Sequence, residues 1–192
     1  MAWKNDQVSE LETEKILEIA KEQVGAPGDF VELGCYKGDT SLLLAEVLKG
    51  SGKELWIYDS FEGLPEKGKE DISVAGDAFR GGELFVAKRE VKERFLRSGL
   101  PVPRIKKAWF KDLEIVDLPS EITLAFLDGD FYDSIRDSLK LVEGKLNKGA
   151  VVIVHDYNNE ALPGVAKAVD EWRAGKNLKT EIYQSMLIIR LV

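Results

Sequence analysis

This sequence of 192 residues has one cysteine and no long apolar run, and both absences narrow what the protein can be. The single cysteine, Cys35, excludes an internal disulfide and a zinc site built from cysteines. No apolar run approaches the length of a membrane span, and the N-terminal residues lack the apolar core of a signal peptide. The sequence therefore predicts a cytoplasmic protein without a membrane partner.

An excess of positive charge is also lacking. The chain has 27 Lys and Arg against 34 Asp and Glu, for a formal net charge of −7. Nucleic acids and anionic membranes are bound by dense basic surfaces, so this balance argues against both partners. The one local basic cluster is Arg104, Lys106 and Lys107, which we interpret as a solvated strand end. The expected partner is a small molecule.

Helical and extended patterns alternate along the chain. Residues 9–24 have the apolar spacing of an amphipathic helix, with Leu11 and Ile16 on its apolar side. Ser9 and Glu12 in this segment have the spacing of a capping box. The stretch 61–82 is rich in Gly, Lys, Asp and Pro and is expected to be a long loop. Further helices are expected at 39–52, 83–99, 132–149 and 164–175, and strands at 28–34, 54–60, 104–110, 122–130, 150–157 and, as one or two strands, 179–192.

This alternation predicts an α/β fold in which parallel strands are joined by right-handed helical crossovers. Residues 150–157 are largely apolar, as a strand that is covered on both faces requires. In such sheets, ligands bind beyond the carboxyl ends of the strands. The candidate site residues are therefore sought at five strand ends, at 32–38, 59–63, 109–112, 128–132 and 155–157.

The first strand end carries a glycine loop, with Gly34 and Gly38 in the segment VELGCYKGDTS. Glycine lets a backbone turn tightly and approach a ligand closely. Glu32 ends the first strand, where a carboxylate can hold an amino group, and Asp59 ends the next, where an acid usually binds ribose hydroxyls. The alternative for each acid is a helix cap. Two acids suit a ligand with a ribose and an ammonium group but no pyrophosphate, which favours S-adenosylmethionine (SAM) over NAD.

Acidic residues also gather at later strand ends. If these strands are neighbours, Asp128, His155 and Asp156 lie together. Carboxylates that cluster without Lys or Arg repel one another unless they share a cation or a proton. This predicts a divalent metal site for Mg²⁺ or, because imidazole is an unusual Mg²⁺ ligand, for Mn²⁺, Fe²⁺ or Zn²⁺. Two alternatives stay open: Asp130 caps the helix that begins near Tyr132, and His155 is a general base or a hydrogen-bonded neutral residue.

Five segments together resemble the macrocin O-methyltransferase family. They are FVELGCYKGDTS, WIYDSFEGLPE, LDGDFYDSIRDSL, GAVVIVHDY and PGVAKAVDEW, within residues 30–172. The resemblance implies a Rossmann-like class I methyltransferase with a mostly parallel seven-stranded sheet flanked by helices. It implies a single domain over residues 1–192, with a lid-like insertion at about 62–99. It also implies SAM- and metal-dependent methylation of a hydroxyl on a small molecule of the sugar or natural-product type.

The same resemblance implies roles for individual residues. Asp128 and Asp156 are expected to bind the metal, with His155 as the third candidate ligand. Asp130 is the expected base for the acceptor hydroxyl, and His155 is the other candidate for proton removal. The expected cofactor-binding residues are Glu32, Gly34, Tyr36, Gly38, Ser41, Asp59, Ser60, Phe61, Trp109, Phe110 and Asp128.

One position departs from the family pattern. The family usually carries two adjacent acids where this chain has His155–Asp156, a pair that is common in a broader set of related methyltransferases.

Two other functions stay open. An NAD(P)-dependent oxidoreductase on a similar fold is disfavoured by the G-x-x-x-G spacing, and a non-catalytic SAM-binding protein is disfavoured by the acids at the strand ends.

Two further features of the sequence leave alternatives open. Trp3, Phe79, Phe85 and Tyr132 are candidates for lining an acceptor pocket, although aromatic residues more often belong to the core. The closing segment SMLIIRLV either lies inside the sheet or forms an edge that pairs with a second copy, which leaves a homo-oligomer open.

Overall fold

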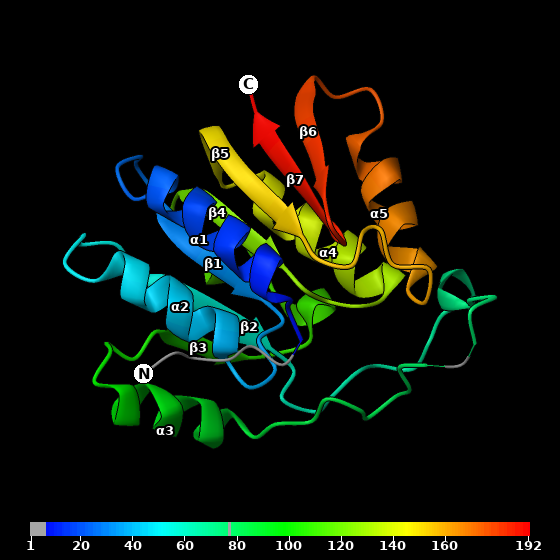
Figure 1. Cartoon of the computed structure of the whole chain (residues 1–192), viewed down its shortest axis with the longest axis horizontal. Helices are drawn as coiled ribbons and strands as arrows, with labels where there is room; N and C mark the ends of the chain where they lie inside the picture. The colour runs from blue at the N-terminus through cyan, green and yellow to red at the C-terminus, as the bar shows by residue number, and fades with distance from the viewer. Residues whose placement is uncertain (1–6, 77) are drawn as a thin grey trace.

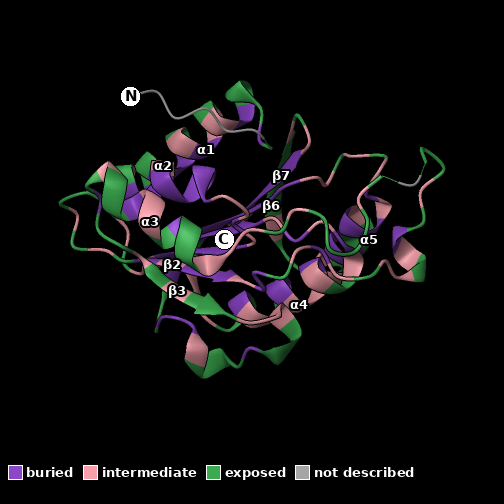
Figure 2. Cartoon of the chain, turned by 90° about the horizontal axis from the view of Figure 1, so that it is seen from below, coloured by how far each residue is buried: buried purple, intermediate pink, exposed green. Residues whose placement is uncertain are grey.

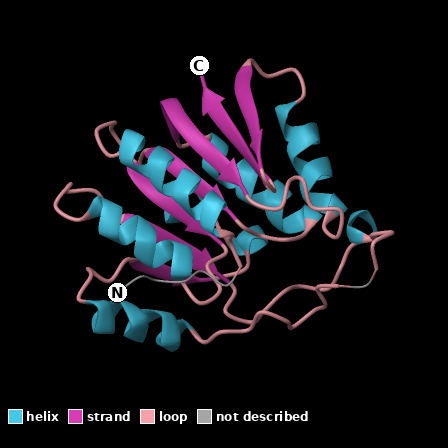
Figure 3. Cartoon of the chain, viewed as in Figure 1, coloured by secondary structure: helices cyan, strands magenta, loops and turns pink. Residues whose placement is uncertain are grey.

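The computed structural model describes residues 7–76 and 78–192, and its centre is a seven-stranded sheet (Figure 1, Figure 3). The strand order is β3-β2-β1-β4-β5-β7-β6. Neighbours from β3 to β5 are parallel, whereas β7 is antiparallel to both β5 and β6. The expected mostly parallel seven-stranded sheet is therefore confirmed. The strands are β1 (Asp29–Leu33), β2 (Leu55–Asp59), β3 (Arg104–Lys107), β4 (Ile122–Leu127), β5 (Leu146–Val154), β6 (Leu178–Tyr183) and β7 (Met186–Leu191).

Helices cover both faces of the sheet, because its central strands are apolar on both sides. Phe30 packs toward α1, α2 and α3, while Val31, the next residue of β1, packs toward α4 and α5. No helix in the described part of the chain is both long and apolar enough to cross a membrane. The helices are α1 (Glu10–Gln23), α2 (Asp39–Leu48), α3 (Lys88–Ser98), α4 (Tyr132–Glu143) and α5 (Pro163–Arg173), with short 3₁₀ turns η1 (Lys69–Asp71), η2 (Phe110–Asp112) and η3 (Ile115–Asp117).

The C-terminal segment forms two strands, and the later one lies inside the sheet. β7 is hydrogen-bonded to β5 on one side and to β6 on the other, and its residues 186–189 are buried. β6 forms the sheet edge, and residues 179–182 within it are exposed. Figure 2 shows the buried strands in the middle of the molecule, between helices that expose their outer sides. The apolar closing segment is therefore core rather than an exposed edge.

Two expected helix boundaries are wrong. Residues 146–149 were expected to end a helix, but they begin β5, because α4 ends at Glu143 and Leu146 pairs with Ile122 of β4. Residues 83–87 were expected to begin a helix, but they are not helical, and the carbonyl of Glu83 accepts a hydrogen bond from Leu64 N. In both places, pairing with a distant segment overrides the local helical pattern.

The orientation of α1 also differs at one residue. Leu11, expected on the apolar side, is 51% exposed, whereas Glu12 is buried. Ile16 lies in the core as expected, and so does Ile19. Glu12 is turned inward because Ser9 at the helix N-terminus and Ser185 in the β6–β7 turn both donate hydrogen bonds to its carboxylate.

A long loop joins β2 to α3. Figure 1 shows it running from the end of β2 out to the side of α5 and back again. Its two arms are tied together near the sheet, where Leu64 N donates to the Glu83 carbonyl and Gly82 N donates to the Leu64 carbonyl, at 2.8 and 2.9 Å. Its outer part is fixed by Asp71, whose Oδ1 accepts from Tyr132 N at 2.7 Å.

Candidate functional site

A single pocket opens at the carboxyl ends of β1, β2, β4 and β5 and gathers most of the expected site residues. Gly38, Ser41 and Phe61 are not among its lining residues. Cys35, Leu64, Phe79 and Leu84 also line it and were not among the expected cofactor residues. The expected residues that line it are Glu32, Gly34, Tyr36, Asp59, Ser60, Trp109, Phe110, Asp128, Asp130, His155 and Asp156.

The glycine loop brings the ends of β1 and β4 into close contact. Gly34 has a φ of +90°, and a Cβ atom at this position would lie 1.9 Å from the backbone oxygen of Asp128. Only glycine fits both the conformation and this approach. Gly38 has a φ of +78° and precedes the first turn of α2. The loop therefore presents its backbone to the pocket directly beside Asp128.

Glu32 lies at the floor of the pocket with only 1% of its surface exposed. Its Oε2 accepts a short hydrogen bond from the hydroxyl of Ser41, which is fully buried. Burial raises the pKa of Glu32 to about 8, and the nearby charge of Asp128 acts in the same direction. A cationic ligand group beside it would favour the ionised carboxylate. Ser41 orients Glu32 from behind rather than lining the pocket.

Asp59 organises the loops at the ends of β1 and β2. Its Oδ2 accepts from Cys35 N at 2.8 Å and from Tyr36 N at 3.3 Å, and its Oδ1 accepts from Phe61 N at 2.7 Å. Each carboxylate oxygen has two lone pairs, so acceptor capacity remains for a ligand in the pocket. The side chain of Phe61 points into the core beside α2 and α3, not into the pocket.

Apolar side chains form another part of the pocket wall. Trp109 and Phe110 come from the segment after β3, and Phe79 and Leu84 come from the long loop. Gly129 makes room for Phe110, because a Cβ there would lie 3.2 Å from the ring carbon Cε2. Of the other aromatic candidates, Trp3 lies outside the described residues. Phe85 is 60% exposed, and Tyr132 does not line the pocket and donates to Glu171 at 2.6 Å.

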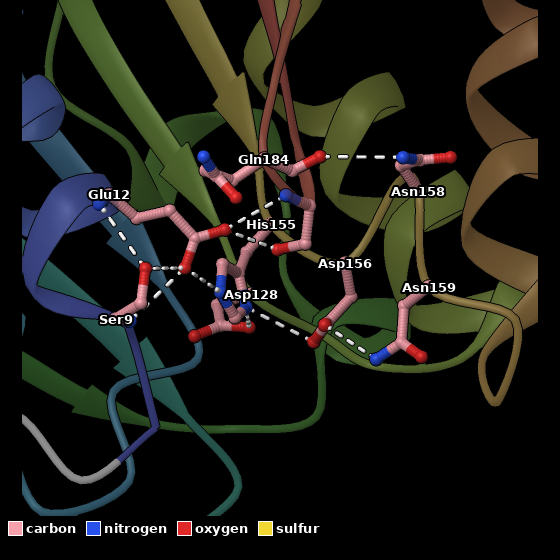
Figure 4. Close-up of polar contacts among 9 residues, drawn as sticks. Ser9, Glu12, Asp128, His155, Asp156, Asn158, Asn159 and Gln184 are labelled. Carbon is pink, nitrogen blue, oxygen red and sulfur yellow. Dashed lines mark hydrogen bonds and ion pairs between the residues drawn. The ribbon is translucent and has the colours of Figure 1, made fainter.

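Asp128, His155 and Asp156 meet as expected. The ends of β4 and β5 are adjacent, and His155 N donates to the Leu127 carbonyl at 3.0 Å. Nδ1 of His155 lies 3.1 Å from Oδ1 of Asp128 and 3.0 Å from Oδ2 of Asp156 (Figure 4). Donor atoms of the three side chains lie within 4.8 Å of one another. The spacing suits a shared cation.

The charges of this cluster determine the protonation of its histidine. Burial alone would lower the pKa of His155, but the negative charge of Asp128 and hydrogen bonds with Asp128 and Asp156 raise it far above its ordinary value. These contacts favour the protonated ring, whose positive charge balances the two carboxylates.

Asp130 does not cap α4, so that alternative is wrong. The N-cap residue of α4 is Phe131, and the amide of Tyr132 donates to Asp71 instead. Asp130 has a φ of +60° and lines the pocket close to the Asp128–His155–Asp156 cluster. Burial and the charges of Asp128 and Asp156 raise its pKa well above the usual range. Positive charge brought into the pocket would lower this pKa and ionise the carboxyl.

Glu12 is the main residue of the site region that the sequence did not indicate. Its carboxylate faces His155 from α1, with 3.9 Å between Oε2 and Nε2 (Figure 4). Burial alone would raise the pKa of Glu12, but His155 and hydrogen bonds from Ser185 and Ser9 lower it below its ordinary value. In the sequence, the capping-box spacing with Ser9 is a sufficient reason for a glutamate at position 12. Nothing else in the sequence indicates a contact between Glu12 and His155.

Comparison with known proteins agrees with this geometry. The family model of macrocin O-methyltransferase (TylF) matches residues 6–186. One relative is the 8-demethyl-8-(2,3-dimethoxy-alpha-L-rhamnosyl)-tetracenomycin-C 4'-O-methyltransferase from Streptomyces olivaceus. It is 33% identical over 157 residues, which is 78% of this chain. This chain spans 59% of that relative's length. Demethyldecarbamoylnovobiocin O-methyltransferase from Streptomyces niveus is 30% identical over 181 residues, covering 88% of this chain and 68% of the relative.

Solved structures show the same architecture. The O-methyltransferase NovP superposes with a TM-score of 0.79 and 27% identity, covering 94% of this chain and 79% of NovP. The calicheamicin methyltransferase CalS11 superposes with a TM-score of 0.76 over 95% of this chain and 80% of its own, at 16% identity. The class I methyltransferase fold and the match of the family model over most of the described residues lead to one conclusion: this chain belongs to the macrocin O-methyltransferase family.

Proposed function

We propose that this protein transfers a methyl group from SAM to a hydroxyl of a sugar or a sugar-bearing natural product. One observation carries the proposal: the acidic cluster of Asp128, His155 and Asp156 lies in the same pocket as the glycine loop. Family membership favours methyl transfer over the oxidoreductase alternative. Relatives named for O-methylation of tetracenomycin, novobiocin and mycinamicin compounds support an acceptor of this class.

SAM would lie across the glycine loop. Glu32 would hold the amino group, because it is buried at the pocket floor and would gain an ionic partner there. Asp59 would accept hydrogen bonds from the ribose hydroxyls, and Trp109 and Phe110, which also line the pocket, would contact the adenine ring. The sulfonium of SAM is already a strong electrophile, so the chain mainly has to align the acceptor and remove its proton.

The cluster also fits a divalent cation. Two carboxylates and one imidazole nitrogen form a donor set that suits Mn²⁺, Fe²⁺ or Zn²⁺ better than Mg²⁺. Asp128, His155 and Asp156 would hold the ion, and it would lower the pKa of an acceptor hydroxyl. Asn159 Nδ2 donates to Asp156 Oδ1 at 2.8 Å and holds that carboxylate in place. Nδ1 of His155 can bind the ion only when this nitrogen carries no proton, so cation binding would release any proton held there.

Asp130 is the proposed base. It lies beside the cluster in the same pocket, and the positive charges of the bound ligands would lower its raised pKa. Its carboxylate would then accept the hydroxyl proton as the new carbon–oxygen bond forms. His155, which is held between two carboxylates, positions the cluster rather than removing this proton.

Calorimetric titration with S-adenosylhomocysteine (SAH), with and without Mn²⁺, followed by a methyl-transfer assay on glycosylated natural products, tests this function. We expect micromolar SAH binding and turnover that Asp130→Asn abolishes while SAH affinity is kept. Failure of the wild-type protein to bind SAH would refute the proposal. Binding without turnover on any acceptor would instead favour the non-catalytic SAM-binding alternative.

A further inference from the structure

The two ring nitrogens of His155 face different carboxylates. Nδ1 faces Asp128 and Asp156 in the pocket, at 3.1 and 3.0 Å. On the opposite side of the ring, Nε2 lies 3.9 Å from Oε2 of Glu12, and both side chains are 6% exposed. Figure 4 shows Glu12 on the α1 side of the ring and Asp128 and Asp156 on the other. The three side chains of the Asp128–His155–Asp156 cluster can bind a cation without Glu12, so the buried carboxylate of Glu12 on the other side of the ring needs a separate explanation.

Four donors fix the Glu12 carboxylate in this position. Ser9 donates its backbone N–H and its hydroxyl to Oε2, at 3.1 and 2.6 Å. Ser185 donates its backbone N–H and its hydroxyl to Oε1, at 2.9 and 2.6 Å. The Ser9 contacts form the capping box of α1, but those from Ser185 come from the distant β6–β7 turn. Capping the helix therefore does not account for the orientation of this side chain.

The same turn is tied to the loop that carries Asp156. Asn158 N donates to the Ser185 carbonyl at 2.9 Å, and Asn158 Nδ2 donates to the Gln184 carbonyl at 3.4 Å. The start of α1, the β6–β7 turn and the loop after β5 therefore form one hydrogen-bonded unit around His155. Such a unit holds the ring at a fixed angle to the pocket.

We propose that Glu12 is a positioning residue that keeps the proton of His155 on Nε2, so that Nδ1 is free to bind a divalent cation together with Asp128 and Asp156. A neutral imidazole binds a cation through one nitrogen only when the other carries the proton. Carboxylates behind metal-binding histidines commonly select the tautomer in this way. The inference rests on the proposed metal site and adds to it a residue outside the pocket lining.

The first test compares Mn²⁺ affinity in two variants of α1. Glu12→Gln keeps the size of the side chain and removes its charge, and Glu14→Gln makes the same change at an exposed position of the same helix. Binding of Mn²⁺ alone is measured by titration with electron paramagnetic resonance as the readout. It should be about 10- to 100-fold weaker in E12Q than in the wild type. E14Q should bind as the wild type does. Wild-type Mn²⁺ affinity in folded E12Q would overturn the proposal.

The second test needs no variant. His155 is the only histidine of the chain, so its ring gives one set of signals in long-range ¹H–¹⁵N spectra. With Zn²⁺ added, we expect a neutral ring that carries its proton on Nε2 and binds through Nδ1. A proton on Nδ1, or a ring that Zn²⁺ does not change, would contradict the proposal.

SAH titration of the same variants without metal distinguishes the role of Glu12 in metal binding from the proposed SAM-dependent function. We expect E12Q to retain SAH affinity while it loses Mn²⁺ affinity, because Glu12 does not line the pocket. A wild-type protein that binds SAH but neither metal ion refutes the role of Glu12 and leaves SAM binding intact. Loss of SAH affinity in E12Q together with a lowered melting temperature would show that Glu12 acts only by stabilising α1.

Discussion

Gly34 and Asp128 approach one another closely at the site. The backbone oxygen of Asp128 occupies the space that a side chain at Gly34 would need, and the positive φ of Gly34 disfavours any other residue. Around this contact, three acids of the pocket have different partners: Ser41 for Glu32, backbone amides for Asp59, and His155 for Asp128. The orientation of these carboxylates in the pocket therefore depends on the hydrogen bonds that they form with neighbouring groups.

Replacing Gly34 by alanine should lower the free energy of unfolding and abolish SAH binding. The backbone conformation alone costs about 1–3 kcal/mol, and the contact at 1.9 Å from the Asp128 oxygen adds to this cost. Urea unfolding and calorimetry measure both effects. Gly25→Ala is the matched control, because a Cβ there would meet nothing within 4 Å. Equal stability of the two variants would contradict the assigned close approach.

The raised pKa of Glu32 predicts how the stability of the SAH-free protein varies with pH. Its pKa of about 8 in the folded protein exceeds the value of 4.5 for an exposed carboxyl, so the folded state binds the proton more tightly. This contribution is complete below pH 4.5 and is lost as the pH rises through about 8, at up to about 1.4 kcal/mol per pH unit. Melting temperatures between pH 5 and pH 9 should therefore fall more steeply for the wild type than for Glu32→Gln. Parallel curves would show that Glu32 ionises normally.

At the scale of elements, the site depends on segments that end beside one another. The parallel strands β1, β4 and β5 bring Glu32, Asp128 and His155 to one edge of the sheet. The long loop adds Phe79 and Leu84 to the pocket wall. This loop is joined to the rest of the fold through Asp71, which is 2% exposed and accepts from Tyr132 N and from Gly68 N. One buried carboxylate thus holds both the loop and the start of α4.

Asp71→Ala should lower the free energy of unfolding by about 1–2 kcal/mol, because it leaves the first amide of α4 without its acceptor. It should also speed proteolytic cleavage within residues 62–87. Asp133→Ala is the control, since that carboxylate lies in the first turn of the same helix but is 68% exposed and pairs with Arg136 of the same helix. If both variants are cleaved at the wild-type rate, Asp71 does not anchor the loop.

At the scale of the whole molecule, the pocket has a floor at one edge of the sheet and a proposed cover. The floor is the strand ends with the glycine loop, and the cover is the insertion at about 62–99, which we propose acts as a lid over the acceptor. Leu64 N donates to the Glu83 carbonyl at the base of this insertion and joins its two arms there. The net charge of −7 and the acids of the pocket favour ligands that bring positive charge with them.

Hydrogen exchange measured by mass spectrometry tests the lid. SAH together with Mn²⁺ should slow exchange in residues 62–87, because closure over the pocket orders the loop. Exchange in β6, at the far edge of the sheet, should stay the same and serves as the internal control. Protection confined to the glycine loop, with none in 62–87, would show that the insertion does not close on the ligands.

The sequence by itself determined the α/β fold, the glycine loop and the meeting of Asp128, His155 and Asp156. It did so because apolar strands separated by helices must run parallel, and parallel strands end at one edge. Only the tertiary structure decided that Glu12 faces His155, that Asp71 rather than Asp130 holds the start of α4, and that residues 146–149 extend β5. These contacts join segments far apart in the chain. Local sequence patterns do not predict such contacts, because hydrogen bonds to distant partners form only when the chain packs.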